Sequence, residues 1–242
     1  MVEANASTFA TVTHLVKPLI DQLQHQRSLQ SNGKRAFSES RTTALRTKHE
    51  PLFTCVTRLL TENGILDAVS QYIGRTANII DINPQVNDSS DDFWQHTFSD
   101  VSDEKPATSY YHRDASGGDI KAIIYLSDVE LDNGPFCFAL GTHKNRPNFI
   151  YNFIQEVNDS SELSSTDIKS RKQFASLPAV LRKKCAFGND LLSDSIAAHS
   201  ILTKEWQITS SKGHVVVFDS KGIHRGGMVL NKERIVITCV LG

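Results

Sequence analysis

Two patterns of apolar and polar residues divide the chain near residue 75. In the first part, apolar residues recur every three or four positions, which places them on one face of a helix. Such stripes span residues 9–23, 52–60 and 65–73, and we expect a helix at each. Pro18 lies inside the first stripe and predicts a bend or break there, because proline lacks the amide donor and clashes with the preceding turn.

Capping signals predict where two of these helices begin. Thr47 and Glu50 have the spacing of a capping box, and Pro51 beside them suits a first helical turn. Asn63 predicts the start of the following helix. The sequence therefore places helix starts near Thr47 and Asn63.

After Gly74 the pattern changes to short apolar segments separated by Asp, Asn, Gly and Ser. The segments are rich in Val, Ile, Phe and Tyr, which favour strands, and span residues 77–82, 93–98, 120–126, 135–140, 214–218 and 235–241. Many short strands with few helices between them predict an antiparallel barrel or jelly roll. We therefore expect a mainly β protein with flanking helices, built on a double-stranded β-helix (jelly-roll, cupin-like) core.

The expected organisation is a single domain over residues 1–242. Residues 1–75 form its helical part, and residues 76–242 form the jelly-roll core. Helical spacing returns within residues 148–206, which predicts a helical insertion in the core.

Composition narrows the classes of function. The chain has 242 residues, 39% of them hydrophobic, and a net charge of -1, which suits a soluble domain without nucleic-acid or membrane-surface partners. No apolar run approaches the roughly 18 residues of a membrane span and no signal peptide is apparent, so a cytoplasmic protein is expected. The four cysteines have no CxxC spacing and predict reduced thiols; they are Cys55, Cys137, Cys185 and Cys239.

The candidate chemistry begins at His112 and Asp114. These residues are two positions apart, so on an extended backbone both side chains point to the same face. Alone, this pair is a weak signal, because the protein has nine histidines and a turn histidine beside an aspartate is the commoner explanation.

A second histidine and an arginine strengthen the hypothesis. His224 follows a predicted strand and a short turn, and glycines at 222, 226 and 227 are expected to leave room for a ligand. Arg234 begins an apolar strand, an unusual place for a permanent cation unless an anion lies opposite. Two histidines and one carboxylate hold Fe(II) on one face and leave the other face open for chemistry.

A longer series of motifs now points to a family. In order along the chain, they are His112-Arg113-Asp114, residues 120–129, Asn133-Gly134-Pro135-Phe136, Gly141-Thr142-His143-Lys144, residues 213–219, His224 and Arg234. Together these motifs resemble the phytanoyl-CoA dioxygenase (PhyH) family of Fe(II)- and 2-oxoglutarate-dependent oxygenases. The resemblance covers roughly residues 77–242.

The resemblance implies a fold, cofactors and a reaction. It implies His112, Asp114 and His224 as iron ligands and Arg234 as the partner of the distal carboxylate of 2-oxoglutarate. Fe(II) and 2-oxoglutarate would be the cofactors, and O2 and a small organic molecule the other reactants. The expected reaction is hydroxylation of a C–H bond, with 2-oxoglutarate converted to succinate and CO2. Asp114 favours oxygenation over halogenation, because halogenating relatives lack this carboxylate.

The chain also departs from the family pattern. Gly226 stands where some relatives have a serine that helps to hold 2-oxoglutarate. Further co-substrate contacts are expected from residues 93–98 and from Ile123 or Tyr125. Gly141 belongs to a turn in which the family commonly has a different sequence, and this change concerns structure rather than chemistry.

Other histidines and arginines have plainer interpretations. His143 is expected to be structural, and His214 is not expected to bind metal. His96 faces the co-substrate or packs in the core, with nothing in the sequence to decide. Strand alternation turns Arg113 and Arg225 away from the iron, and we expect them to be solvated surface charges, with an anionic substrate as the alternative partner.

Two other classes of function remain open. One is a jelly-roll protein that binds a metal or small acid without catalysis, and the other is a zinc-dependent hydrolase with the same ligand types. The sequence shows no general base for a hydrolase. It predicts neither the substrate nor the oligomeric state.

Overall fold

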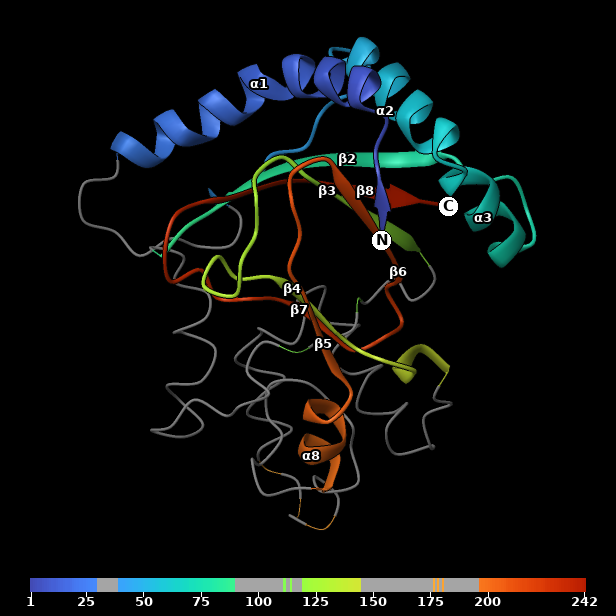
Figure 1. Ribbon diagram of the computed structural model, residues 1–242, viewed down its shortest axis with the longest axis vertical. Helices are drawn as coiled ribbons and strands as arrows, with labels where there is room; N and C mark the ends of the chain where they lie inside the picture. Colours follow the sequence, from blue (N-terminus) through green and yellow to red (C-terminus); the bar gives the residue numbers. More distant parts are fainter. Residues whose placement is uncertain are drawn as a thin grey trace.

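The computed structural model describes residues 1–29, 39–89, 111, 114, 119–144, 176, 178, 180 and 196–242. Two antiparallel sheets form its centre (Figure 1). The larger sheet has the order β1 (Val2–Glu3), β6 (His214–Asp219), β3 (Ile120–Tyr125), β8 (Arg234–Leu241) and β2 (Ile79–Asn87). The smaller sheet has the order β5 (Glu205–Ile208), β4 (Phe136–Ala139) and β7 (His224–Gly226). The predicted jelly-roll fold with flanking helices is thus confirmed.

Helices cover the outer face of the larger sheet. These are α1 (Ala6–Leu29) and α2 (Glu50–Glu62), whereas α3 (Ile65–Ile73) lies beside one end of the sheet, and the smaller sheet lies on the opposite side of the larger one (Figure 1). Apolar side chains from α1, α2 and α3 pack with those from β2, β3 and β8 in one core. The short α8 (Ile196–Leu202) lies beyond the smaller sheet. Among the described helices, none is long and apolar enough to cross a membrane.

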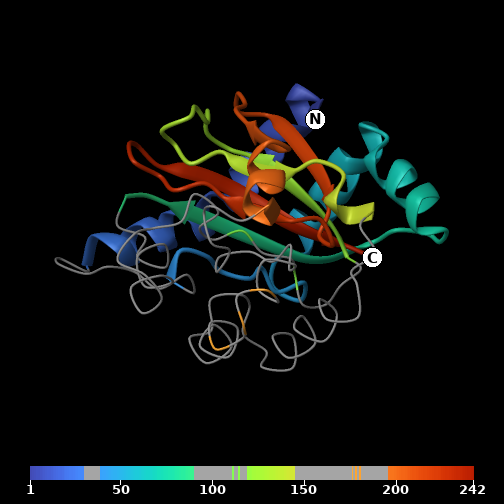
Figure 2. The same cartoon turned by 90° about the horizontal axis from the view of Figure 1, so that it is seen from below.

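Alternation along the strands creates a second core between the two sheets. Ala122 and Ile124 of β3 face the helices, whereas Ile123 and Tyr125 face the smaller sheet. This follows from the two-residue period of a strand. Figure 2, turned by 90°, shows the strands of the larger sheet side by side. The space between the sheets is therefore lined by every second residue of β3, β6 and β8.

Most predicted strands are present. Residues 77–82, 120–126, 135–140, 214–218 and 235–241 overlap β2, β3, β4, β6 and β8 respectively. The predicted strand 93–98 lies outside the described residues. The short strands β5 and β7 were not predicted, and β5 begins inside the segment assigned to the helical insertion. Of that insertion, α8 is described, and most of the rest lies outside the described residues.

The helix details differ from expectation. The helix α1 continues unbroken through Pro18, which is exposed, because the buried Val16 and Leu19 on either side pack on the core and hold the helix together. Pro51 lies in the first turn of α2 as predicted, but the predicted side-chain caps at Thr47 and Asn63 are wrong. Thr47 lies in a turn, and α2 begins at Glu50 without a side-chain cap.

Asn63 ends α2 instead of starting α3. Its side-chain amide donates a hydrogen bond to the Leu59 carbonyl at 2.7 Å. Gly64, with φ +66°, is the N-cap residue immediately before α3. This bond satisfies a carbonyl group in the last turn of α2. The Asn63 side chain therefore caps the C-terminus of α2, whereas we had expected it to cap the N-terminus of α3.

Candidate metal centre

His224 is fixed inside the protein at the first position of β7. It pairs with Phe138 of β4, and 4% of its surface is exposed. Its Nδ1 lies 2.8 Å from the Gly222 carbonyl oxygen. Because a carbonyl only accepts hydrogen bonds, Nδ1 carries the proton and donates, which leaves the lone pair of Nε2 for a metal.

Asp114 faces this nitrogen. Its Oδ2 lies 3.6 Å from His224 Nε2 and 2.8 Å from Lys121 Nζ. The backbone N–H of Asp114 also donates to the Ser220 carbonyl at 3.3 Å. Two ligand atoms that are each about 2.1 Å from one metal are separated by about 3 to 4.2 Å, according to the angle between them. The observed separation therefore suits a shared cation.

The fold thus unites two of the three predicted ligands from distant parts of the chain. The third, His112, lies outside the described residues. In the described part of the chain, no group of three His, Cys, Asp or Glu side chains gathers at one point. One imidazole nitrogen and one carboxylate oxygen are donors that suit Fe(II).

Lys121 is a residue that the sequence reasoning missed. It lies two positions before Ile123 on β3, and its ammonium group contacts Asp114. The alternation of β3 places Lys121 on the same inward face as Ile123 and Tyr125. A lysine in phase with inward-facing apolar residues was the available signal.

Arg234 lies at the start of β8, with 7% of its surface exposed. Its Nη1 donates to the carbonyls of Gly134 and Gly227, the latter at 3.2 Å. Its Nη2 donates to Asn87 Oδ1 at 3.0 Å, and Asn87 is its partner in the β2 and β8 ladder. The guanidinium is therefore held in one orientation by three protein oxygens.

Tyr125 lies beside Arg234 in the core between the sheets. Burial raises the pKa of Tyr125 to about 12, although the charge of Arg234 acts in the opposite direction. Within the described residues, its hydroxyl makes no hydrogen bond of normal geometry, although the Phe136 amide lies close enough to favour the ionised form. Tyr125 is thus an uncharged, buried hydroxyl next to a guanidinium, which is a suitable pair for a carboxylate.

The glycines near His224 have a different role from the predicted one. A Cβ at Gly222 would overlap the ring of Phe138, and a Cβ at Gly227 would meet Pro135 O at 2.5 Å. A Cβ at Gly226 would lie 3.1 Å from Arg234 Nη2. These glycines admit neighbouring parts of the protein, so the prediction that they leave room for a ligand is wrong.

Arg225 is also not the solvated charge that we expected. Its Nη2 lies 2.6 Å from Glu205 Oε1, and its Cζ lies 4.3 Å from the centre of the Tyr111 ring. Alternation does turn it away from His224, to the outer face of the smaller sheet. That face is covered by Tyr111 and by Ile201 of α8, so the Arg225 side chain is only 14% exposed. Arg113 lies outside the described residues.

The structure also describes several of the other histidines and the cysteines considered in the sequence. His143 lies in a short 3-10 helix, Thr142–Lys144, with its ring centre 6.3 Å from that of Phe138. His214 Nδ1 lies 3.0 Å from the Ser211 carbonyl oxygen at the start of β6. His96 lies outside the described residues. Cys55, Cys137 and Cys239 are free thiols as predicted, and Cys185 is outside the described part.

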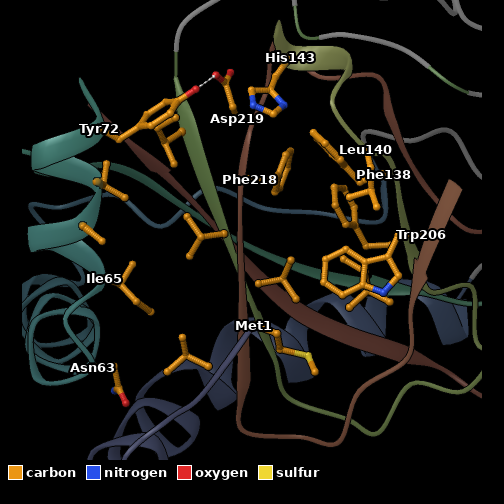
Figure 3. A pocket seen from close by; sticks show the side chains of 18 of the residues that line it. Met1, Asn63, Ile65, Tyr72, Phe138, Leu140, His143, Trp206, Phe218 and Asp219 are labelled. Atoms are coloured by element: carbon orange, nitrogen blue, oxygen red, sulfur yellow. Dashed lines mark hydrogen bonds between the residues drawn. The ribbon is translucent and has the colours of Figure 1, made fainter. Parts of the chain in front are cut away.

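An apolar cavity of about 490 Å³ lies between α3, β6 and the inner face of the smaller sheet (Figure 3). Phe136 and Phe218 line it and also pack against His224, with ring centres 5.7 and 5.0 Å from the imidazole. At one end, the Tyr72 hydroxyl donates to Asp219 at 2.6 Å. The volume lies within the range of small-molecule sites.

A jelly roll with an imidazole and a carboxylate facing each other inside is compatible with a non-haem iron site. The sequence matches the family described as phytanoyl-CoA dioxygenase (PhyH) over residues 17–235. The chain belongs to this family of Fe- and 2-oxoglutarate-dependent oxygenases, as its motifs predicted, and the predicted cofactors are those of the family. A search of curated proteins found no match.

Solved structures share the fold. AviO1 from Streptomyces viridochromogenes Tue57 matches at 15% identity with a TM-score of 0.52, covering 100% of this chain and 86% of that one. HygX from Streptomyces hygroscopicus, with nickel and 2-oxoglutarate bound, matches at 14% identity and 0.50, covering 95% and 78%. EctD from S. alaskensis, with bound Fe, matches at 14% identity and 0.51, covering 98% and 69%. At such identities, the likeness concerns the fold alone.

Proposed function

We propose that this protein hydroxylates a C–H bond of a small organic substrate. In the balanced reaction, substrate, O2 and 2-oxoglutarate give the alcohol, succinate and CO2, with one oxygen atom in each of the alcohol and succinate. His112, Asp114 and His224 would hold Fe(II), which when bound supplies the activation of O2. Arg234 would bind the distal carboxylate of 2-oxoglutarate.

The observation that carries the proposal is the arrangement of His224 and Asp114. The hydrogen bond from Nδ1 to Gly222 fixes both the tautomer and the ring orientation, so that Nε2 faces Asp114 Oδ2 at 3.6 Å. Hydrogen bonds of this kind commonly orient metal-binding histidines. Phe136 and Phe218 pack beside the same ring and limit the access of water to it.

The other end of the proposed site is formed by Arg234 and Tyr125. A planar guanidinium and a neutral phenol both donate hydrogen bonds, and both are preorganised by burial. Together they favour a dicarboxylate, which would be held by the metal at one end and by Arg234 at the other. Asp114 supports oxygenation rather than halogenation, because a carboxylate ligand occupies the position that a halide needs.

The test is succinate formation by the purified protein with Fe(II), 2-oxoglutarate and O2, coupled to a mass-spectrometric screen for a product 16 mass units heavier than its substrate. We expect the wild type to release succinate and the variants His112→Ala and Asp114→Ala to lose this activity. Asp67→Ala, which removes an exposed carboxylate on α3, is the control and should keep it.

Three outcomes would contradict the proposal. Wild-type succinate release by Asp114→Ala would refute the ligand assignment. Metal binding without 2-oxoglutarate turnover would favour a non-catalytic binding protein. Hydrolysis that is indifferent to 2-oxoglutarate would favour a zinc enzyme.

A further inference from the structure

Three polar side chains meet on the outer face of the smaller sheet. Glu205 Oε1 accepts a hydrogen bond from the Tyr111 hydroxyl at 2.5 Å and one from Arg225 Nη2 at 2.6 Å. The Arg225 guanidinium also lies over the Tyr111 ring, at 4.3 Å from its centre. Each member of this group, which we name the Tyr111–Glu205–Arg225 clamp, therefore contacts the other two.

The clamp is enclosed by protein. Tyr111 is fully buried, and the side chains of Arg225 and Glu205 are 14% and 13% exposed. Burial tends to raise the pKa of Glu205, but hydrogen bonds from Tyr111 and Gln207 and the charge of Arg225 outweigh it and lower the pKa. Glu205 is thus ionised, and its charged hydrogen bonds are strong because little water competes for them.

The position of the clamp in the sequence connects it to the metal centre. Tyr111 immediately precedes His112, and Arg225 immediately follows His224. The contact of the Arg225 guanidinium with the Tyr111 ring therefore joins the segment that leads into His112 to the strand that carries His224. On the other side of His112, the backbone of Asp114 is held by Ser220.

We propose that Tyr111, Glu205 and Arg225 are positioning residues that set the distance between the segments carrying His112 and His224, and thereby the affinity for iron. This inference rests on the proposed function. The clamp does not touch the metal. It acts through the two backbone segments, as outer-shell groups do when they orient ligands.

Stability alone does not account for such a group. A buried ion pair loses much of its Coulombic gain to the cost of removing both charges from water, and apolar residues of similar volume are often as stable. What the clamp adds over an apolar contact is a fixed geometry, because Glu205 accepts from two donors at once while the guanidinium stacks on the ring.

The test is Co(II) affinity, measured by titration without O2 and followed by visible absorption, together with the free energy of unfolding. We expect Glu205→Gln and Tyr111→Phe to weaken Co(II) binding about tenfold, and Arg225→Met by about 10 to 100-fold. The control, Arg58→Met, breaks an arginine–glutamate contact of the same 2.6 Å length on the exposed surface of α2, and should bind Co(II) as the wild type does.

The choice of variants distinguishes a loss of ligand positioning from a loss of folding. Tyr111→Phe keeps the buried ring, so it reports on metal binding even if Arg225→Met does not fold. Because the clamp acts as a unit, the Tyr111→Phe and Arg225→Met effects on Co(II) affinity should be less than additive when combined. Folded clamp variants that bind Co(II) within twofold of the wild type would overturn the inference. A wild-type protein that binds no Co(II) would overturn the proposed function, and the clamp with it.

Discussion

Substitution of Gly134 by alanine should damage both the fold and the co-substrate site. Gly134 has φ +67°, and a Cβ there would overlap the Gly227 carbonyl oxygen and lie 2.8 Å from its carbon and 2.9 Å from the carbonyl carbon of Met228. All three are backbone atoms, so no side-chain rotation relieves the contact. The carbonyls of Gly134 and Gly227 both accept hydrogen bonds from Arg234, so separating them displaces the guanidinium.

The expected loss has two parts. The left-handed backbone costs an alanine about 1–2 kcal/mol, and overpacking against rigid neighbours costs about 1–3 kcal/mol. Gly74→Ala is the matched control, because Gly74 has φ +74° but no atom within 4 Å of its Cβ position. It should therefore lose only the first part. In a protein of this size, about 2–4 °C is lost per kcal/mol, so Gly134→Ala should melt about 2 to 12 °C below Gly74→Ala.

Thermal unfolding and 2-oxoglutarate titration of the two variants together test these expectations. We expect Gly134→Ala to bind 2-oxoglutarate at least about tenfold more weakly, which corresponds to about 1.4 kcal/mol, and Gly74→Ala to bind it normally. Equal melting temperatures for the two variants would show that the turn at Gly134 adjusts to the added methyl group at little cost in stability. A lower melting temperature with unchanged 2-oxoglutarate affinity would show that Gly134 does not position Arg234.

Two further predictions concern charged groups. Lys121→Met should lower the stability of the metal-free protein by about 1.5–3 kcal/mol, because Asp114 loses its ammonium partner. A bound cation replaces that partner, so added Co(II) should raise the melting temperature of this variant more than that of the wild type. An equal rise in the two proteins would contradict this prediction. The pKa of Glu205 is lowered on folding from 4.5, so its contribution to stability is present above about pH 4.5 and is lost as the pH falls through the lower folded value. Urea unfolding over an acid pH series should therefore be steeper in pH for the wild type than for Glu205→Gln, and parallel curves would refute the assignment.

The part of the site that the sequence predicted is the part that follows from strand alternation. The burial of Arg234 in β8 follows from its phase with Val236, which lies on the inner face. Lys121 was predictable by the same rule, because it is in phase with Ile123 and Tyr125. Local periodicity is therefore enough to choose a face for a residue.

The shielding of Arg225 from most of the solvent was not predictable in this way. Alternation gives its face, but whether that face meets water depends on what covers it. Here the cover comes from Tyr111 and Ile201, and the counter-charge comes from Glu205, all from other segments. The close packing of Gly222 on Phe138 is likewise a contact between separate strands, which sequence spacing does not reveal.

Arg225 also affects the register in which β7 pairs with its neighbour. The strand has three residues, His224–Gly226, and so few backbone bonds specify register weakly. A shift by one residue exchanges the two faces of a strand. It would move the guanidinium to the inner face and leave Glu205 without its cation, and a buried carboxylate that loses its ionic partner costs several kcal/mol. The same ion pair that we propose as a positioning device thus also excludes the register in which His224 points away from Asp114.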